Sequence, residues 1–160
     1  GCLLLTLLAE RPTATGVGVE RSPPALAVAR GNAARLGVAA RAELLEGDWF
    51  GPVRGRFDLV VSNPPYVTEA DYAGLAPEVR GWEPLAALIP ENDPGDGLAA
   101  VRTIAAGLPG ALAPGGRALV EVGAGQAEAA ARLLAAAGLS PVAAHPDADG
   151  RARVVEARAP

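Results

Sequence analysis

The order of apolar segments predicts an α/β fold with a mostly parallel sheet that ends in an antiparallel hairpin. Short strand-like runs alternate with stretches of helical periodicity, which is the pattern of parallel strands joined by helices. The run RFDLVVSN at 56–63 is almost continuously apolar, as expected of a strand covered on both faces. The runs at 140–147 and 151–159 are separated only by a turn at Asp149-Gly150, so no crossover helix fits and the two strands must pair antiparallel.

The first elements are recognised by their ends. Residues 2–10 predict a helix, and residues 14–20 predict a short buried strand. Ser22 is a good N-cap for the next helix, Pro23 suits its first position, and Gly37 ends it. The apolar positions at helical spacing in this second helix are Leu26, Ala29, Ala33 and Leu36.

The later elements follow the same alternation, with one long interruption. They are a strand within 42–50, the strand at 56–63, a helix from Leu98 to about Leu112, a strand at 115–123 and a helix at 125–138. Residues 68–97 interrupt this order, because they contain four prolines and no periodicity. A long irregular segment in a compact domain is usually functional.

Composition limits the class of protein. At 160 residues, 50% of them hydrophobic and 20% charged, the chain fits one globular domain of residues 1–160 and not a disordered chain. Cys2 is the only cysteine, so we expect no intrachain disulfide, no zinc cluster and a reduced, cytoplasmic setting. The apolar run near the start is too short to span a membrane. The net charge of −4 gives no broad attraction to nucleic acid.

Two acidic positions follow successive strands. Glu20 ends the strand at 14–20, where an acid in nucleotide-binding βαβ units accepts hydrogen bonds from ribose hydroxyls, and Gly1 lies 19 residues before it. Asp48 and Trp49 end the next strand, where an acid can accept from an adenine amino group and an aromatic ring can pack on the base. The alternatives are an acid that caps the following helix at Glu20, and a turn Asp beside a core Trp at 48–49.

The most specific signal is Asn63-Pro64-Pro65-Tyr66, directly after the apolar strand. The Asn63 side-chain oxygen and the Pro64 carbonyl can both accept hydrogen bonds. Together they can satisfy both protons of one planar NH2 group. The prolines fix φ and hold these acceptors rigidly, and Tyr66 offers a flat face for stacking. The alternative is a tight proline turn without a ligand. His145, the lone histidine, predicts only a structural or surface role.

Several further motifs narrow the class of enzyme. They are GDWF at 47–50, NPPYV at 63–67, EPLAAL at 83–88, DGL at 96–98, EVGAGQ at 121–126 and DADGRARVV at 147–155. In combination and in this order, they resemble the peptide chain release factor glutamine N5-methyltransferase family, which uses S-adenosyl-L-methionine. The resemblance covers essentially the whole chain.

The resemblance implies a Rossmann-like class I methyltransferase sheet and a set of roles. The cofactor would be S-adenosyl-L-methionine and the partner a release factor, whose Gly-Gly-Gln glutamine accepts the methyl group on its side-chain nitrogen. Neither a metal, nor a membrane, nor direct contact with nucleic acid is implied. The implied cofactor-binding residues are Gly1, Glu20, Asp48, Trp49 and Asn63. The implied catalytic residues are Asn63, Pro64 and Tyr66, and the substrate-binding set adds Pro65, Glu83 and Pro84.

Two parts of that family are absent from this sequence. Its members carry an N-terminal helical domain and a glycine-rich segment that forms the first strand and the methionine-binding loop, of which Gly1 resembles the last glycine. We therefore expect an N-terminally truncated catalytic domain whose first, central strand is missing, so that the strands ending at Glu20 and Asn63 do not have their usual neighbour.

Two other functions remain open at this point. An amino-methyltransferase that acts on adenine or guanine in DNA or RNA would use the same Asn-Pro-Pro-Tyr site on a flipped base. Residues 68–97 carry seven acids and one arginine, Arg80, and such a rim repels phosphate. The second alternative is an inactive, truncated remnant that only binds a partner.

Overall fold

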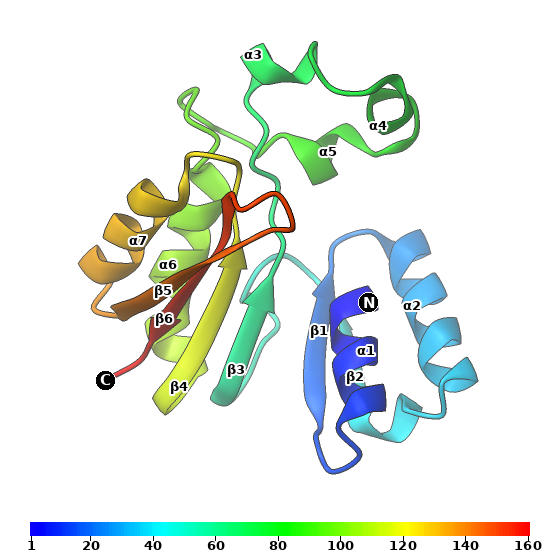
Figure 1. Cartoon of the computed structure of the whole chain (residues 1–160). Coiled ribbons are helices and arrows are strands. Elements are labelled where there is room, and N and C mark those ends of the chain that lie inside the picture. The colour runs from blue at the N-terminus through cyan, green and yellow to red at the C-terminus, as the bar shows by residue number, and fades with distance from the viewer. The chain divides into compact units, whose positions relative to one another are not determined.

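The computed structural model describes all of residues 1–160 (Figure 1). The chain forms two compact units, an N-terminal unit of Gly1–Gly55 and a C-terminal unit of Arg56–Pro160. The first holds a two-stranded sheet of β1 (Gly16–Glu20) and β2 (Ala42–Glu46). The second holds a four-stranded sheet in the order β3 (Phe57–Ser62), β4 (Leu112–Glu121), β6 (Ala152–Arg158) and β5 (Ser140–Pro146). Strands β1 and β3 belong to different sheets and do not pair with each other. That residues 1–160 act as one domain stays a prediction.

The N-terminal unit is a βαβ arrangement with one additional helix. Its elements are α1 (Cys2–Glu10), β1 (Gly16–Glu20), α2 (Pro23–Arg35), a short 3-10 turn (Ala39–Arg41) and β2 (Ala42–Glu46). The strands β1 and β2 are parallel. Leu5 and Leu8 of α1 are buried against Ala33 and Val38, which forms a small apolar core.

One cation ends α1. The guanidinium of Arg41 donates to the carbonyls of Leu8 at 2.8 Å, Ala14 at 2.7 Å and Arg11 at 3.1 Å. Carbonyls in the last turn of a helix have no partner within it, and they carry partial negative charge. Arg41 therefore supplies both donors and positive charge at the end of α1, and ties it to the start of β2.

The predicted start of α2 is confirmed, and its predicted end is one residue too long. Ser22 Oγ accepts from the backbone N–H of Ala25 at 3.4 Å, and Pro23 occupies the first helical position. Leu36 was expected on the apolar face, but the helix ends at Arg35 and the Leu36 side chain is exposed. Gly37 follows with φ of +68°, a conformation that stops helices at low cost for glycine.

The C-terminal unit contains the remaining strands and five helices. They are β3 (Phe57–Ser62), α3 (Glu69–Tyr72), α4 (Pro77–Trp82), α5 (Leu85–Leu88), α6 (Ala99–Ala111), β4 (Leu112–Glu121), α7 (Ala127–Ala136), β5 (Ser140–Pro146) and β6 (Ala152–Arg158). The strands β3 and β4 are parallel, and β6 pairs antiparallel with both β4 and β5. The predicted antiparallel hairpin is therefore confirmed.

Helices α6 and α7 contact each other and pack on the sheet (Figure 1). The face of α6 that carries Val101, Ile104 and Leu108 is fully buried, as is Leu134 of α7. The sheet contributes alternating buried residues, as expected of a strand with one face on a core. These sheet residues are Ala118, Val120, Val155 and Ala157.

Polar contacts fasten the hairpin. Glu156 of β6 is only 8% exposed, and its carboxylate accepts from Arg117 of β4 at 3.3 Å and lies 2.9 Å from His145 Nε2 of β5. A buried carboxylate needs such partners, because an unpaired charge would lose its hydration. His145 thus pairs across the hairpin, which agrees with a structural role.

The prediction that residues 68–97 lack regular elements is wrong, since α3, α4 and α5 lie there. They were missed because each is only four to six residues long, too short to show periodicity. Local signals do mark them: Thr68 Oγ1 accepts from the backbone N–H of Asp71 at 3.1 Å, and Pro77 is the first residue of α4. No helix in the structure is long and apolar enough to cross a membrane.

The packing of α6 makes a direct prediction about stability. Leu108 is 0% exposed, so Leu108→Ala should lower the free energy of unfolding by about 2–5 kcal/mol through lost burial and the cavity left behind. The matched control, Leu85→Ala in α5, removes a side chain that is 56% exposed and should change it by less than about 0.5 kcal/mol. Urea denaturation followed by circular dichroism measures both. Equal losses in the two variants would contradict this account of the core.

Candidate functional site

The segment Asn63–Tyr66, hereafter the NPPY segment, leaves β3 at its carboxyl end. Asn63 is exposed, Pro64 is buried, and Pro65 and Tyr66 are half-buried. Neither the Asn63 side chain nor the Pro64 carbonyl takes part in a hydrogen bond within the chain. Both predicted acceptors are therefore unpaired within the chain, the Asn63 side chain at the surface and the carbonyl of the buried Pro64.

The hydroxyl of Tyr66 is held by two neighbouring strands. It accepts from Arg153 Nη2 of β6 at 2.9 Å and donates to Glu121 Oε1 at the end of β4 at 3.2 Å. The guanidinium carbon of Arg153 also lies 5.1 Å from the centre of the Tyr66 ring, within cation–π range. The ring thus packs against Arg153, and its hydroxyl is already used by the protein.

The charges around Tyr66 oppose each other. Burial raises the pKa of Tyr66 above its ordinary value, the Arg153 charge acts to lower it, and the Glu121 carboxylate raises it again. The phenol therefore stays neutral well above physiological pH and can keep donating to Glu121.

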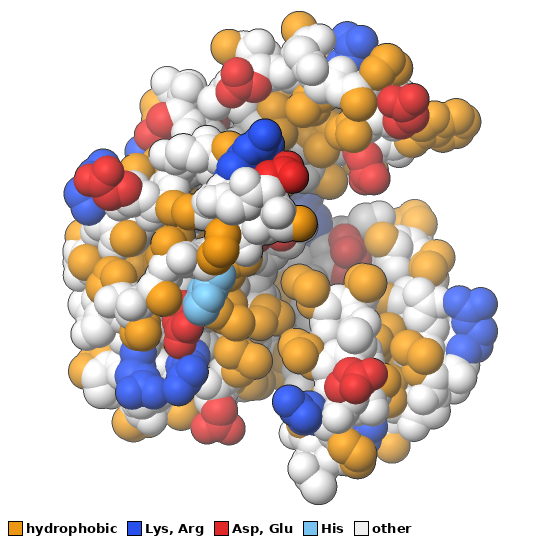
Figure 2. Space-filling view, in the orientation of Figure 1, with side chains coloured by type: hydrophobic (Ala, Val, Ile, Leu, Met, Phe, Trp, Pro, Cys, Tyr) orange, Lys and Arg blue, Asp and Glu red, His pale blue; other side chains and the backbone are white.

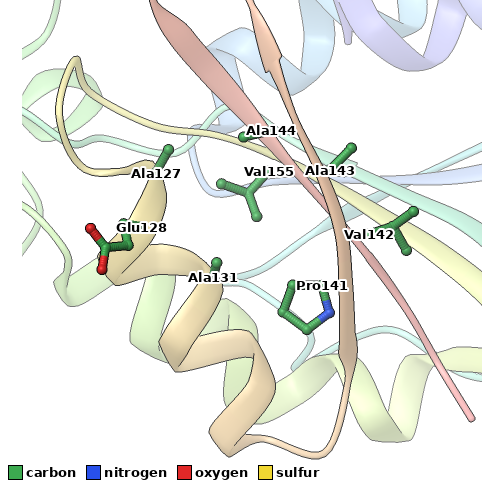
Figure 3. Close-up of a pocket in the computed structure, with 8 residues that line it drawn as sticks. All are labelled: Ala127, Glu128, Ala131, Pro141, Val142, Ala143, Ala144 and Val155. Atoms are coloured by element: carbon green, nitrogen blue, oxygen red, sulfur yellow. The ribbon is translucent and has the colours of Figure 1, made fainter.

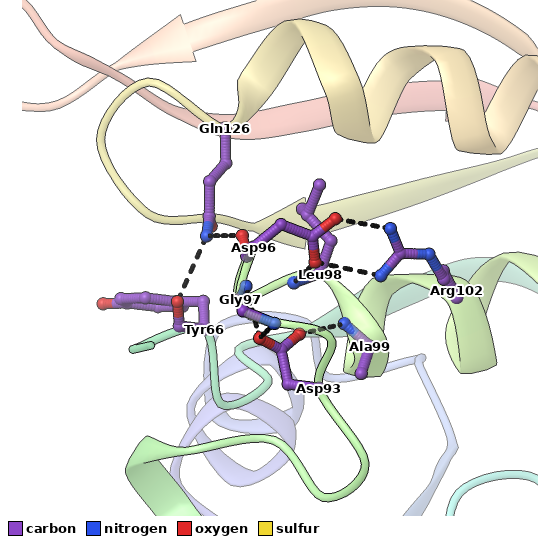
Figure 4. A network of polar contacts seen from close by, with 9 residues as sticks. Tyr66, Asp93, Asp96, Gly97, Leu98, Ala99, Arg102 and Gln126 are labelled. Atoms are coloured by element: carbon purple, nitrogen blue, oxygen red, sulfur yellow. Dashed lines mark hydrogen bonds and ion pairs between the residues drawn. The ribbon is translucent and has the colours of Figure 1, made fainter. Parts of the chain in front are cut away.

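The carbonyl of Tyr66 is held from another direction (Figure 4). Gln126, the residue before α7, donates from Nε2 to the carbonyls of Tyr66 at 3.2 Å and Asp96 at 2.9 Å. Its Oε1 accepts from the backbone N–H of Gly123 at 2.7 Å. Both N–H groups and the oxygen of this amide are in use, which fixes its orientation.

The turn before α6 is built around Asp93 (Figure 4). The Asp93 carboxylate accepts from the backbone N–H groups of Gly95 at 2.9 Å, Gly97 at 2.8 Å and Ala99 at 3.1 Å. Gly97 has φ of +69°, and a side chain there would overlap the Tyr66 carbonyl and the Gln126 amide. Only glycine fits, so the turn and the NPPY segment are in direct contact.

An ion pair closes the same turn. Asp96 and Arg102 of α6 approach to 2.5 Å, and Asp96 also accepts from the backbone N–H of Leu98 at 3.0 Å. The hydrogen bond from Arg102 is the main cause that lowers the pKa of Asp96 from its ordinary 3.8 to about 2. Both side chains are more than 40% exposed, so the pair contributes little free energy.

The N-terminal unit places its two acids at one edge of β1-β2. Glu20 pairs with Glu46 in the parallel register, so Asp48 follows two residues beyond that edge. Glu20 accepts from the backbone N–H of Ser22 at 2.8 Å, and its carbonyl accepts from Gly47 at 3.1 Å. The capping role that we kept as an alternative is therefore present, but it uses one oxygen of the Glu20 carboxylate and leaves the other available.

The remaining predicted cofactor residues lie in the same unit. Asp48 is exposed, and its carboxylate makes no hydrogen bond, whereas Trp49 is half-buried with φ of +48°. Gly1 precedes α1, and a Cβ there would lie 2.9 Å from that of Ala29 in α2. That these residues and the NPPY segment serve one ligand stays a prediction.

Glu83 and Pro84 form the exposed junction between α4 and α5. Beside them Trp82 is 86% exposed and Leu85 is 56% exposed. Figure 2 shows apolar and acidic side chains together on the surface of the segment that carries α3–α5. A backbone hydrogen bond connects this segment to the residue after the NPPY segment: the N–H of Val67 donates to the Leu88 carbonyl at 2.9 Å.

Sequence reasoning missed the residues that hold Tyr66, namely Glu121, Gln126 and Arg153. All three lie in the EVGAGQ and DADGRARVV motifs, but no role could be assigned to them. Their meeting depends on β6 lying next to β4 and on the turn before α7, neither of which is a local property. The motifs themselves were the only available signal.

A groove between α7 and the hairpin is not a candidate site (Figure 3). It has a volume of about 410 Å³ and is lined mainly by alanine, valine and proline side chains of α7, β5 and β6. Glu128 is its only charged residue. Binding sites usually combine apolar walls with convergent polar groups, which this groove lacks.

Comparison with other sequences gives consistent matches. Residues 1–76 match the family model described as Methyltransferase small domain. A release factor glutamine methyltransferase of Cereibacter sphaeroides is 57% identical over 160 residues, which cover 100% of this chain and 56% of that protein. The one of Rhodospirillum rubrum is 47% identical over 158 residues, covering 99% of this chain and 48% of that protein. The chain thus spans about half the length of the curated relatives it matches.

Solved structures confirm the predicted methyltransferase fold. A methyltransferase from Pyrococcus furiosus superposes with a TM-score of 0.68 at 18% identity, covering 98% of this chain and 68% of that one. TrmN from Thermus thermophilus gives 0.66 at 18% identity, covering 100% and 41%. An RNA methyltransferase from Salinibacter ruber in complex with S-adenosyl-L-homocysteine gives 0.59 at 20% identity, covering 100% and 74%. At such identities the likeness concerns the fold alone.

The Asp96–Arg102 pair predicts a pH effect on stability. Because the pKa of Asp96 is lowered in the folded state from 3.8 to about 2, its stabilising contribution is complete above about pH 4 and is lost as the pH falls toward 2. Arg102→Gln should therefore lower the free energy of unfolding by less than about 1 kcal/mol at pH 5 and by nearly nothing at pH 2. Urea denaturation across this range tests it, with Arg80→Gln on α4, an exposed arginine outside any ion pair, as the control for a lost positive charge. A difference that grows toward pH 2 would contradict the assignment.

Proposed function

We propose that the protein containing this chain methylates peptide chain release factors. By sequence, the chain belongs to the release factor glutamine methyltransferase family. The methyl group would come from S-adenosyl-L-methionine, and the acceptor would be the side-chain nitrogen of the glutamine in their Gly-Gly-Gln motif. The observation that carries this proposal is a pair of acceptors without a hydrogen bond in the chain, Asn63 Oδ1 and the Pro64 carbonyl, on a proline-stiffened segment at the end of β3.

The cofactor fits what the N-terminal unit offers. Glu20 keeps one carboxylate oxygen for ribose hydroxyls, and Asp48 has a free carboxylate for the adenine amino group beside the half-buried Trp49. Ligands of open α/β sheets collect at the carboxyl ends of strands, which is where these acids lie. Gly1, at the start of α1, would face the methionine part, and Asn63 would lie between cofactor and substrate. When bound, S-adenosyl-L-methionine supplies an electrophilic methyl group on its sulfonium.

The amide nitrogen of glutamine needs help as a nucleophile, because its lone pair is delocalised into the carbonyl. Asn63 Oδ1 and the Pro64 carbonyl would each accept a hydrogen bond from one of its two N–H groups, and the nitrogen would release one of these protons to water once it carries the methyl group. These contacts increase the electron density on nitrogen and hold its lone pair toward the methyl group. Orientation and preorganised dipoles of this kind can contribute several kcal/mol to a transfer reaction.

The rest of the segment would shape the substrate site. Pro65 limits the movement of the Pro64 carbonyl, and Tyr66 would pack beside the glutamine while its hydroxyl stays bound to Arg153 and Glu121. Glu83 and Pro84, at the exposed junction of α4 and α5, would contact the flanking residues of the release factor.

An amino-methyltransferase of nucleic acids would use the same two acceptors on an exocyclic amine. The segment 68–97 argues against it, since its seven acids and one arginine would repel phosphates. Incubation of the protein with labelled cofactor, a release factor and total RNA or DNA, followed by mass spectrometry, separates the two functions. Label on the Gly-Gly-Gln glutamine supports the proposal, and label in nucleic acid alone would refute it.

Asn63→Ala should lower kcat on the order of 10- to 100-fold while leaving cofactor affinity nearly unchanged. The reason is that one proton of the substrate amide then lacks an acceptor in a closed site, at a cost of about 1–3 kcal/mol. Asn32→Ala on α2 is the matched control, because it removes an amide far from β3 in sequence and in another unit. Turnover assays beside calorimetry with the cofactor give both quantities. Unchanged turnover in Asn63→Ala would remove Asn63 from the site.

A further inference from the structure

One side chain, Gln126, joins three segments that meet at the NPPY segment (Figure 4). Its amide nitrogen bridges the carbonyls of Tyr66 and Asp96, and its amide oxygen accepts from Gly123 in the turn before α7. Its side chain therefore connects the end of the NPPY segment to the turns that begin α6 and α7. Nothing in the proposed chemistry yet uses this residue.

The contact with the Tyr66 carbonyl acts on the backbone, unlike the contacts of the hydroxyl. Arg153 and Glu121 hold the far end of a side chain that can still rotate about its own bonds. Gln126 holds a peptide group that lies two residues from the Pro64 carbonyl. Between them stands Pro65, whose φ is fixed by its ring. Because Pro65 cannot rotate about φ, fewer backbone bonds can absorb a shift of the Tyr66 carbonyl before it reaches the Pro64 carbonyl and Asn63.

We propose that Gln126 is a positioning residue for methyl transfer, which holds the Asn63 and Pro64 acceptors where they orient the substrate NH2 group. This inference rests on the proposed function. Gln126 does not touch the substrate; it acts through the Tyr66 peptide group.

The environment requires an amide at position 126. Two carbonyls need donors and one N–H needs an acceptor, and glutamine supplies all three. An ionised glutamate would place negative charge against both carbonyls and donate to neither. A methionine would fill a similar volume without either polar group. Gly97 packs directly against this amide, because a Cβ at Gly97 would overlap Gln126 Nε2.

The test compares Gln126→Met and Gln126→Glu with wild type in the protein that contains this chain, with kcat, cofactor affinity and pH profile as readouts. Both variants should lower kcat at least about tenfold near neutral pH, because small displacements of reacting groups cost on the order of 10²-fold. Cofactor affinity should remain within about twofold, since Gln126 lies outside the unit with the proposed nucleoside site. Glu128→Met, on the exposed side of α7, is the control and should retain wild-type kcat.

The pH profile separates positioning from general damage. As the pH falls, the carboxyl of Gln126→Glu becomes protonated and regains one donor for a carbonyl. Its kcat relative to wild type should therefore rise about fourfold as the pH falls from 8 to 4.5, close to the ordinary pKa of a glutamate carboxyl, whereas that of Gln126→Met should stay flat. A ratio for Gln126→Glu that is also flat, or wild-type kcat in Gln126→Met, would overturn the proposal.

Failure of this inference can be told from failure of the proposed function. If wild type methylates an amino group of nucleic acid and no release factor, the proposed function is wrong, and the same variants assayed on that substrate still test Gln126. Hydrogen exchange adds a readout without any substrate: Gln126→Met should speed exchange of the Val67 and Gly97 amides relative to those in the core of α7. Equal exchange in wild type and variant would overturn the positioning role.

Discussion

Tyr66 is held at two places, its side-chain hydroxyl and its backbone carbonyl, by groups that the packing of the C-terminal unit brings together. The hydroxyl of Tyr66 reaches Glu121 and Arg153, which lie on adjacent strands because β6 pairs with β4. Its carbonyl reaches Gln126, which lies at the start of α7. The apolar packing of α6 and α7 on the sheet brings these groups to one place, and the polar contacts then fix the NPPY segment. What remains unpaired is the pair of acceptors that the proposed reaction needs.

Near Tyr66, most hydrogen-bonding groups have a partner within the protein, and the two proposed substrate acceptors do not. Every buried side-chain nitrogen and oxygen of the chain has a partner, whereas the carbonyl of the buried Pro64 has none within the chain. An open acceptor in such surroundings would be costly if water could not reach it. Asn63 is exposed, so its oxygen is hydrated until a ligand replaces the water. The exchange of water for an amide NH2 group then costs little and gives orientation.

Sequence reasoning predicted the elements whose signals are local. The strand at 56–63, the Ser22 cap and the hairpin turn at Asp149-Gly150 each depend on residues close in the chain, and the structure contains them. The short helices α3–α5 escaped because a helix of four residues has no periodicity to detect. Arg153 escaped for a different reason: its contact with Tyr66 spans 87 residues and exists only because of the strand order.

The same contrast applies to the candidate site. NPPY could be singled out because two prolines after a strand are unusual and their rigidity has an evident use. Glu20 could be placed at a strand end from the sequence. Only the structure shows that one of its carboxylate oxygens accepts from the backbone N–H of Ser22 while the other makes no hydrogen bond. Gln126 lay in the EVGAGQ motif without an assigned role, because its three partners come from three loop segments that are far apart in the chain or set by the fold.

The central claim is that Asn63 Oδ1 and the Pro64 carbonyl accept hydrogen bonds from the two N–H groups of one side-chain amide. Proton–nitrogen NMR of a Gly-Gly-Gln peptide, labelled with nitrogen-15 at the glutamine side chain and bound to the protein with S-adenosyl-L-homocysteine, tests this most directly. The account predicts that both NH2 protons move downfield and exchange slowly with water, and that in Asn63→Ala only one of them does. Two protons that keep their free-peptide shifts and exchange rates in the bound state would contradict it.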